Sequence, residues 1–183
     1  MTDVPSRTFI SIKIPALKAV RDIFDELEDV GNIRSPPFDQ LHVTLLFLGD
    51  VNSKSIPTLC DRVRRALSDT NEFDVVLKDV GTFPRDDRPR IIWIGVEADP
   101  LNEIVLKISR ELDMMHLDYD RRTFVPHITV GRANGKDDVH DLIERNRNLE
   151  FGSFRCTRID VMESLIGRSG TKHSIIDSVT LAK

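Results

Sequence analysis

The stretch "QLHVTLLFLGD", residues 40–50, places His42 and Thr44 two residues apart in an otherwise apolar run that is typical of a strand. In a strand, residues i and i+2 point to the same face about 6.5–7 Å apart, so His42 projects beside Thr44. Val43 then points to the opposite face, into the core. On its own the pattern is weak, because a single histidine in an apolar strand is usually a hydrogen-bonded core residue.

The same pattern returns in "FVPHITVGR", residues 124–132, as His127 and Thr129. Two matching pairs in two predicted strands are far less expected by chance than one. Together the two pairs supply two imidazoles and two hydroxyls that could form one site. This favours a functional role for the four side chains over a role in core packing.

Composition limits the classes of function that the chain can have. It has 183 residues, 40 % of them hydrophobic, and a net charge of -4, so an RNA partner would need a local basic cleft. The two cysteines, Cys60 and Cys156, form no metal-ligand spacing, and no apolar run approaches the length of a membrane span. We therefore expect a cytoplasmic protein with reduced thiols and no membrane association.

Hydrophobic periodicity and turn residues predict an alternating order of strands and helices. Strands are expected at residues 7–15, 41–48, 72–83, 90–96, 124–130, 153–165 and 173–181, with a "GRSG" turn before the last of them. Helices are expected at 16–30, from Ser53 or Ser55 to 67, at 100–117 and at 136–148.

Both parts of the chain follow the order strand, helix, His/Thr strand, helix, strand. The two histidines lie 85 residues apart, and the openings of the two first strands, Arg7 and Arg90, lie 83 apart. We interpret residues 1–183 as one bilobal domain, with duplicated halves at about 7–83 and 90–164 and a C-terminal strand at 173–181. Such pseudo-twofold halves would present both histidines to a shared cleft.

Two histidines and two threonines suit the hydrolysis of a cyclic phosphodiester. One imidazole can take a proton from water while the other protonates the departing oxygen, and the hydroxyls can hold the phosphate oxygens. One imidazole must start neutral and the other protonated. The symmetry of the two motifs leaves open which is which.

The motifs closely resemble the two H-x-[ST]-x signatures of the two-histidine (2H) phosphoesterase superfamily. Within it, the chain is most similar to the RNA 2′,3′-cyclic phosphodiesterase (2′-5′ RNA ligase-like) family. "RTFISIKIP" resembles the family's opening strand, "GTFPRDDRPRIIWIGV" its central segment, and "ESLIGRSG" its late strand and turn. The resemblance therefore covers nearly the whole chain.

The resemblance implies an α+β fold in which two antiparallel β-sheets line a central cleft and helices pack on the outside. It implies hydrolysis of RNA 2′,3′-cyclic phosphate ends to 2′-phosphomonoesters without a metal or cofactor. His42 would be the proton donor and His127 the proton acceptor, while Thr44 and Thr129 would bind the phosphate. Arg132 resembles a basic residue that many relatives carry there, and would also contact phosphate.

The chain departs from the family at His173, where relatives often carry a tyrosine. We leave His173 out of the catalytic set, as a residue that either stacks on a base or packs. Four further aromatic residues near the motifs and the central segment are expected in the core and not as platforms for base stacking: Phe47, Phe83, Trp93 and Phe124. The loop arginines could line a path for RNA, although solvated charge is the expectation for most of them: Arg34, Arg85, Arg88, Arg121 and Arg122.

Three alternatives stay open. A metal hydrolase would need a third ligand beside the two histidines, and Asp39 and Asp50 are not compelling candidates. A non-catalytic module would bind terminal phosphates of RNA with the same cleft. The reverse reaction would join RNA ends through a 2′-5′ linkage, with a 5′-hydroxyl replacing water. One chain supplies both motifs, so a monomer suffices for any of them.

Overall fold

The computed structural model describes residues 5–85, 87–167 and 170–183. The strands are β1 Ser6–Lys13, β2 His42–Val51, β3 Phe73–Phe83, β4 Ile91–Glu97, β5 His127–Arg132, β6 Glu150–Cys156, β7 Arg158–Gly167 and β8 Gly170–Thr180. The α-helices are α1 Lys18–Asp29, α2 Ile56–Ala66, α3 Leu101–Met114 and α4 His140–Arg145, and two short 3-10 helices are η1 Phe38–Gln40 and η2 Ser53–Ser55. The predicted α+β class is therefore confirmed.

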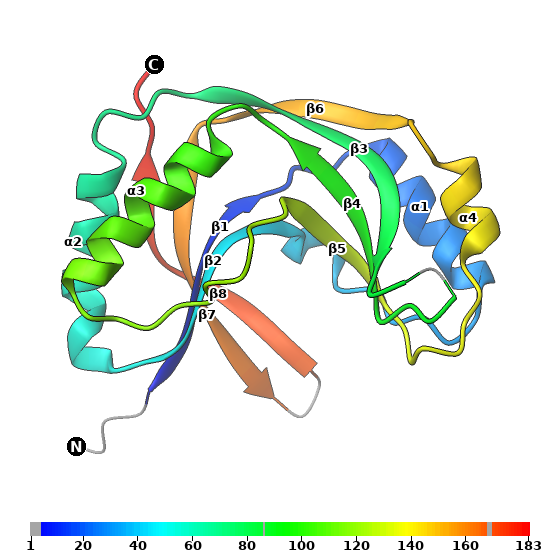
Figure 1. Ribbon diagram of the computed structural model, residues 1–183, viewed down its shortest axis with the longest axis horizontal. Coiled ribbons are helices and arrows are strands. Elements are labelled where there is room, and N and C mark those ends of the chain that lie inside the picture. The colour runs from blue at the N-terminus through cyan, green and yellow to red at the C-terminus, as the bar shows by residue number, and fades with distance from the viewer. Residues whose placement is uncertain (1–4, 86, 168–169) are drawn as a thin grey trace.

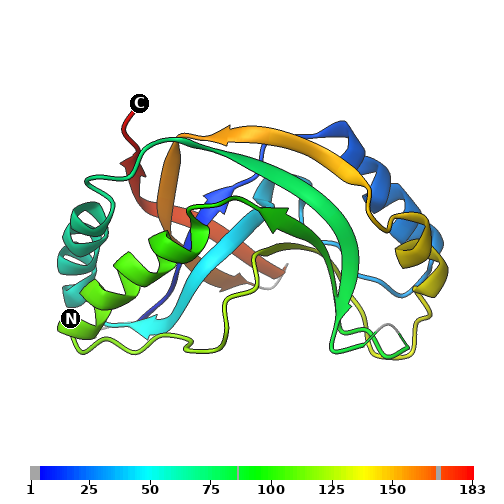
Figure 2. The same ribbon diagram turned by 45° about the horizontal axis from the view of Figure 1, so that its top comes forward.

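The strands form one eight-stranded sheet in the order β6-β3-β4-β5-β2-β1-β7-β8. Every pairing in it is antiparallel. The two groups of four strands meet where Val43 of β2 pairs with Ile128 of β5. The two expected antiparallel sheets are thus the halves of one curled sheet, which arches across the molecule in Figures 1 and 2.

The two halves of the sheet exchange a strand. β3 follows α2 in sequence but pairs with β4 and β6, whereas β7 pairs with β1 and β8. Neither of the sequence halves 7–83 and 90–164 therefore forms a lobe by itself. The internal duplication stays a prediction, and the exchange shows that each half of the sheet needs residues from both parts of the chain.

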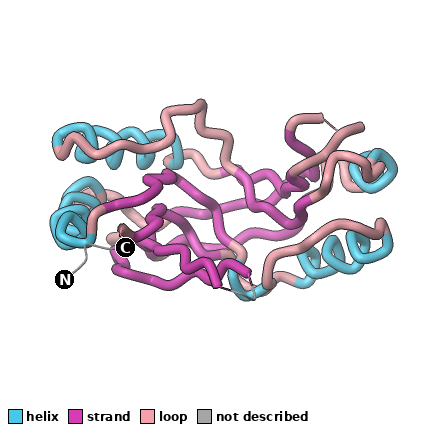
Figure 3. The backbone as a smooth tube through the Cα atoms, turned by 90° about the horizontal axis from the view of Figure 1, so that it is seen from below, coloured by secondary structure: helices cyan, strands magenta, loops and turns pink. Residues whose placement is uncertain are grey.

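Helices gather in two pairs at opposite ends of the strands, as seen from below in Figure 3. α2 packs against α3, and these helices contact β8 and β2 respectively. α1 contacts β5 and β6, while α4 contacts β3. The second pair is linked where Glu26 of α1 accepts hydrogen bonds from Arg145 and Asn146. Each pair therefore covers one half of the sheet.

The apolar residues of α1 and α3 recur at helical spacing and form one buried stripe on each helix. α1 buries Val20, Ile23, Phe24 and Leu27, and α3 buries Leu101, Ile104, Ile108 and Leu112. Both helices begin close to the predicted residue, and both end before the predicted end. In both, one apolar stripe provides the contact with the sheet.

Several predicted boundaries are wrong, among them those of the strand expected at 124–130, which is β5 at His127–Arg132. The expected strand 153–165 is two strands, because the chain passes from one half of the sheet to the other at Thr157, between β6 and β7. The expected helix 136–148 is only the short α4, and the C-terminal strand begins at Gly170 instead of residue 173. The interior of the "GRSG" turn lies outside the described residues.

Both cysteines are buried and unpaired. Within the described residues, no helix has the length and apolar character needed to cross a membrane.

Val43 and Ile128 are both fully buried at the junction between the halves of the sheet. We predict that Ile128→Ala lowers the free energy of unfolding by about 2–5 kcal/mol, because it leaves a cavity in a packed core. Urea denaturation followed by circular dichroism measures the change.

Ile166→Ala is the matched control, since the Ile166 side chain is 74 % exposed and its truncation should change stability by less than about 0.5 kcal/mol. Equal stability of the Ile128→Ala variant and the wild type would show that the junction is not a packed core.

Candidate active site

The two His/Thr strands lie side by side at the centre of the sheet and open onto one cleft of about 640 Å³. His42 and Thr44 line it from β2, and His127 and Thr129 line it from β5. All four side chains are half-buried, whereas the residues between them point into the core. The structure therefore brings together the four residues that the motifs singled out.

Backbone carbonyls orient both imidazoles in the same way. His42 Nδ1 lies 2.8 Å from the Gln40 carbonyl oxygen, and His127 Nδ1 lies 2.7 Å from that of Val125. A carbonyl oxygen can only accept a hydrogen bond, so each Nδ1 carries the proton and donates it. Nε2 of each ring is then the atom that is free to exchange a proton with a ligand.

Aromatic rings pack against each imidazole. Phe9 lies 5.0 Å from His42 between ring centroids, and Phe83 lies 5.2 Å edge-on from His127. Trp93 packs behind Phe83, at 5.4 Å. These rings limit the rotation of the imidazoles. Phe83 and Trp93 are half-buried, so they belong to the support of the site and not to the deep core where we expected them.

Phe47 was also expected in the core, and this expectation is wrong. The pairing of β1 with β2 shifts register between Ile10 and Ser11, which leaves Leu45 as an extra residue in β2. This bulge buries Leu45 and Leu46 in succession and turns Phe47 toward the cleft, which it lines. A one-residue change of phase inside a strand cannot be read from alternation of residue types alone.

His173 was left out of the candidate set, yet the structure places it in the cleft. Its ring lies 5.1 Å from that of His42, edge-on, and its Nδ1 is 3.1 Å from the Ser164 hydroxyl. Its backbone N–H donates to the side-chain oxygen Oε1 of Gln40, the residue whose backbone carbonyl accepts from His42 Nδ1. His173 and Gln40 therefore support the position of the His42 ring.

The cleft is strongly basic. Arg7, Arg34 and Arg132 line it, and no carboxylate is among the lining residues that the structure describes. Arg7 also lies over the Phe47 ring, 5.1 Å from its centroid. The local basic cleft that RNA would need is present in a protein of net charge -4. Arg34 is one of the loop arginines that could line an RNA path, and the structure places it in the cleft.

The other arginines named from the sequence lie outside this cleft. Arg85 pairs with Asp87, Arg121 with Asp113, and Arg122 with Asp120. Each is therefore an exposed, paired charge, as expected.

The electrostatics of the cleft act mainly on His42. Burial lowers the pKa of its imidazole, the hydrogen bond to the Gln40 carbonyl opposes this, and the positive charges of Arg132 and His127 add to the lowering. Burial likewise lowers the pKa of His173, followed by the charges of His42 and Arg132. An anion in the cleft would offset the positive charges and favour protonation of His42.

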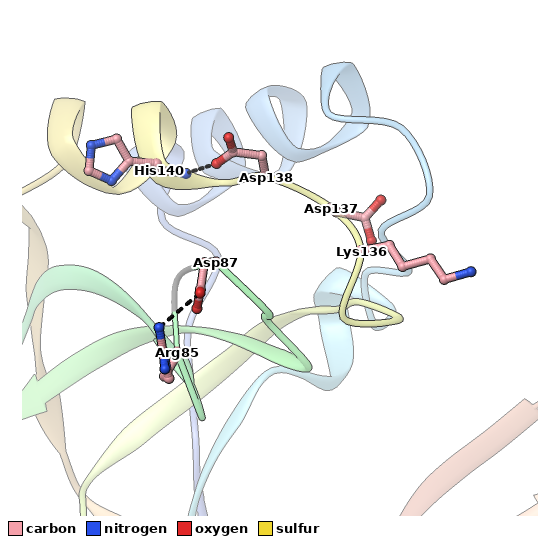
Figure 4. Close-up of a pocket in the computed structure, with 6 residues that line it drawn as sticks. All are labelled: Arg85, Asp87, Lys136, Asp137, Asp138 and His140. Atoms are coloured by element: carbon pink, nitrogen blue, oxygen red, sulfur yellow. Dashed lines mark hydrogen bonds and ion pairs between the residues drawn. The ribbon is translucent and has the colours of Figure 1, made fainter.

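A second hollow of about 570 Å³ lies between the loop after β3 and the start of α4 (Figure 4). Its lining mixes opposite charges: Arg85, Asp87, Lys136, Asp137, Asp138 and His140. The acidic side chains there would repel a phosphate, and both histidines of the motifs lie elsewhere. We therefore place the candidate site in the cleft between β2 and β5.

The match to a known family extends over most of the chain. The model of the 2′-5′ RNA ligase superfamily matches residues 16–167. This chain belongs to that superfamily. The predicted family is thereby confirmed.

Several curated relatives of this superfamily carry the same name. The RNA 2′,3′-cyclic phosphodiesterase of Methanocaldococcus jannaschii is 30% identical over 174 residues, which cover 93% of this chain and 98% of the relative. That of Methanothermobacter thermautotrophicus is 29% identical and covers 90% of this chain and 92% of the relative.

Solved structures show the same fold. A protein of Thermus thermophilus superposes with a TM-score of 0.79 at 21% identity, covering 96% of this chain and 97% of that one. E. coli LigT in its apo form superposes with a TM-score of 0.76 at 23% identity, covering 98% of this chain and 99% of that one. The curled antiparallel sheet with outer helices is thus a fold that this chain shares with these distant proteins.

The positive charge of Arg132 lowers the pKa of His42, so we predict that Arg132→Gln raises it. The pKa of His42 in the free protein is measured by following its ring signals in an NMR titration, with His42→Ala identifying those signals. Arg110→Gln removes an equal charge from the exposed surface of α3 and should leave this pKa in place. An unchanged His42 pKa in Arg132→Gln would contradict the electrostatic account of the cleft.

Proposed function

We propose that this protein hydrolyses RNA ends that carry a 2′,3′-cyclic phosphate to 2′-phosphomonoesters, by acid–base catalysis with two histidines and without a metal. The observation that carries the proposal is the presentation of two imidazoles, each with a free Nε2, to one cleft lined by arginines and threonines. The name of the curated relatives, RNA 2′,3′-cyclic phosphodiesterase, supports the same substrate.

In the proposed reaction, His127 Nε2 takes a proton from water while the water oxygen forms a bond to phosphorus. The bond between phosphorus and the ribose 3′ oxygen breaks, and protonated His42 gives its Nε2 proton to that oxygen. The products are a 2′-phosphomonoester and a 3′-hydroxyl, with His127 protonated and His42 neutral. Proton exchange with solvent restores the starting state.

The two histidines lie on different strands, and this arrangement suits the reaction. His42 comes from one half of the sheet and His127 from the other, so they approach a ligand in the cleft from different strands. Attack and departure occur on opposite sides of phosphorus, which requires the acid and the base to be separate groups. The choice of His42 as donor follows the family resemblance.

Thr44, Thr129 and Arg132 complete the proposed site by binding the phosphate. Each threonine hydroxyl can donate to a non-bridging oxygen, and the guanidinium supplies a fixed positive charge. These groups would stabilise the additional negative charge that develops on the phosphate in the transition state. They also keep the phosphate close to both imidazoles.

The proposal of a mechanism without a metal rests on which side chains could act as metal ligands. Among the residues that the structure describes, no group of three or more His, Cys, Asp or Glu side chains is placed to hold a metal ion. A catalytic zinc needs three protein ligands, and Asp39 and Asp50 are absent from the lining of the cleft. The described cleft therefore favours proton transfer by imidazole.

We place this reaction in the cytoplasm and assign it to a monomer, with RNA ends as the partner. A single chain provides both histidines, both threonines and the basic lining. The same groups could run the reverse reaction, 2′-5′ joining of RNA ends, because a 5′-hydroxyl can replace water. The high concentration of water favours hydrolysis.

We predict that His42→Ala and His127→Ala each lower kcat by about 10²–10⁴-fold on an oligonucleotide with a 2′,3′-cyclic phosphate end. Thr44→Val and Thr129→Val should each lower kcat/KM about tenfold, through the loss of one hydrogen bond to a charged group. Chromatography that resolves 2′-phosphate, 3′-phosphate and ligated products measures the rates and the direction.

Turnover should persist in EDTA, and Arg110→Gln should match the wild type. Full activity of either histidine variant would overturn the two-histidine mechanism. A 3′-phosphate product would overturn the assignment of His42 as the donor to the 3′ oxygen.

A further inference from the structure

Arg34 and Arg132 lie directly opposite each other at the edge of the cleft. The Arg34 N–H donates to the Arg132 carbonyl and the Arg132 N–H donates to the Arg34 carbonyl, both at 2.9 Å. Residues that exchange both backbone hydrogen bonds are a directly opposed pair, whose side chains project to the same face. Both side chains are exposed, and both line the cleft.

Close packing of the loop before η1 fixes this pair. Ile33 lies so close to Gly131 that a Cβ atom there would be 2.8 Å from Ile33 Cγ2 and 3.3 Å from Ile92 Cδ1. The glycine therefore lets Ile33 pack against the end of β5. Arg34, the next residue, is held beside Arg132 as a result.

Two like charges directly opposite each other are destabilising unless another charge compensates them. Within the described residues, neither arginine forms an ion pair with a carboxylate, and the cleft has no acidic lining. Most of the other described arginines do form an ion pair with Asp or Glu. Arg62, for example, pairs with Glu111, and Arg158 pairs with Asp160. A negatively charged ligand in the cleft would compensate the charges of Arg34 and Arg132.

A terminal cyclic phosphate cannot supply all of this charge. It carries one negative charge and two non-bridging oxygens, and the proposed function already gives it Thr44, Thr129 and Arg132 as partners. Arg34 adds a further fixed positive charge at the same edge of the cleft. RNA provides the next negative charge on the 5′ oxygen of the terminal ribose, because the chain continues only in that direction from a 2′,3′-cyclic end.

We propose that Arg34 binds the phosphate on the 5′ oxygen of the terminal nucleotide, next to Arg132 on the cyclic phosphate. This inference rests on the proposed function, and it makes the substrate a nucleotide with two phosphates: an RNA strand and not a nucleoside 2′,3′-cyclic monophosphate. Arg34 is then a specificity-determining residue, since a guanidinium binds phosphate oxygens with directed, charge-assisted hydrogen bonds.

Two substrates that differ in one phosphate test the proposal. Adenosine 2′,3′-cyclic phosphate and its 5′-phosphorylated form are compared by kcat/KM. For the wild type we expect kcat/KM to be about tenfold or more higher for the 5′-phosphorylated substrate. This factor corresponds to the free energy of one hydrogen bond to a charged group. In Arg34→Gln this ratio should fall to about one, and Arg34→Lys should restore part of it.

The control variant is Arg110→Gln, which removes the same charge from exposed α3 and should keep the wild-type ratio. A wild-type ratio of one would overturn the proposal. So would an Arg34→Gln variant that keeps the wild-type ratio, including one that loses activity equally on both substrates.

A measurement of binding affinity tests the Arg34 subsite independently of the proposed catalytic function. Calorimetry compares the affinities for adenosine 2′-phosphate and adenosine 2′,5′-bisphosphate in the wild type and in Arg34→Gln. A 5′-phosphate preference that disappears in Arg34→Gln supports the subsite even where the wild type turns over neither cyclic substrate, a result that would refute the proposed function alone. Equal affinities in the wild type would overturn the subsite whatever the turnover.

Discussion

The pairing of Val43 with Ile128 is the constraint on which the rest of the site depends. Both side chains are fully buried where the two halves of the sheet meet. Because side chains alternate along a strand, burial of these two residues forces His42, Thr44, His127 and Thr129 to the other face. A slip of one residue in either strand would bury a histidine and expose a core residue.

The cleft concentrates positive charge in an otherwise acidic protein. Three arginines and three histidines line it, and the acidic side chains that balance the surface arginines lie elsewhere. This positive charge would attract a phosphate. Burial lowers the pKa of His42, and the positive charges of Arg132 and His127 add to the lowering. Binding of a phosphate and protonation of His42 are therefore coupled, since each favours the other.

Several features of the site depend on contacts between distant parts of the chain. The bulge at Leu45 turns Phe47 toward the cleft, and the fit of Ile33 over Gly131 brings Arg34 to Arg132. The split at Thr157 sends β6 and β7 to opposite halves of the sheet, although no glycine or proline marks it. None of these produces a local sequence pattern, because each is set by which segments pair.

The sequence by itself determined the His/Thr strands, the amphipathic helices and the family, because alternation and helical periodicity are local consequences of burial. It also indicated that His42 and His127 would share a site. Only the tertiary structure decided that β3 and β7 exchange between the halves, that His173 supports His42, and that Arg34 faces Arg132. The physical reason is that strand pairing and loop packing join residues far apart in sequence, and residue type alone does not encode which partners meet.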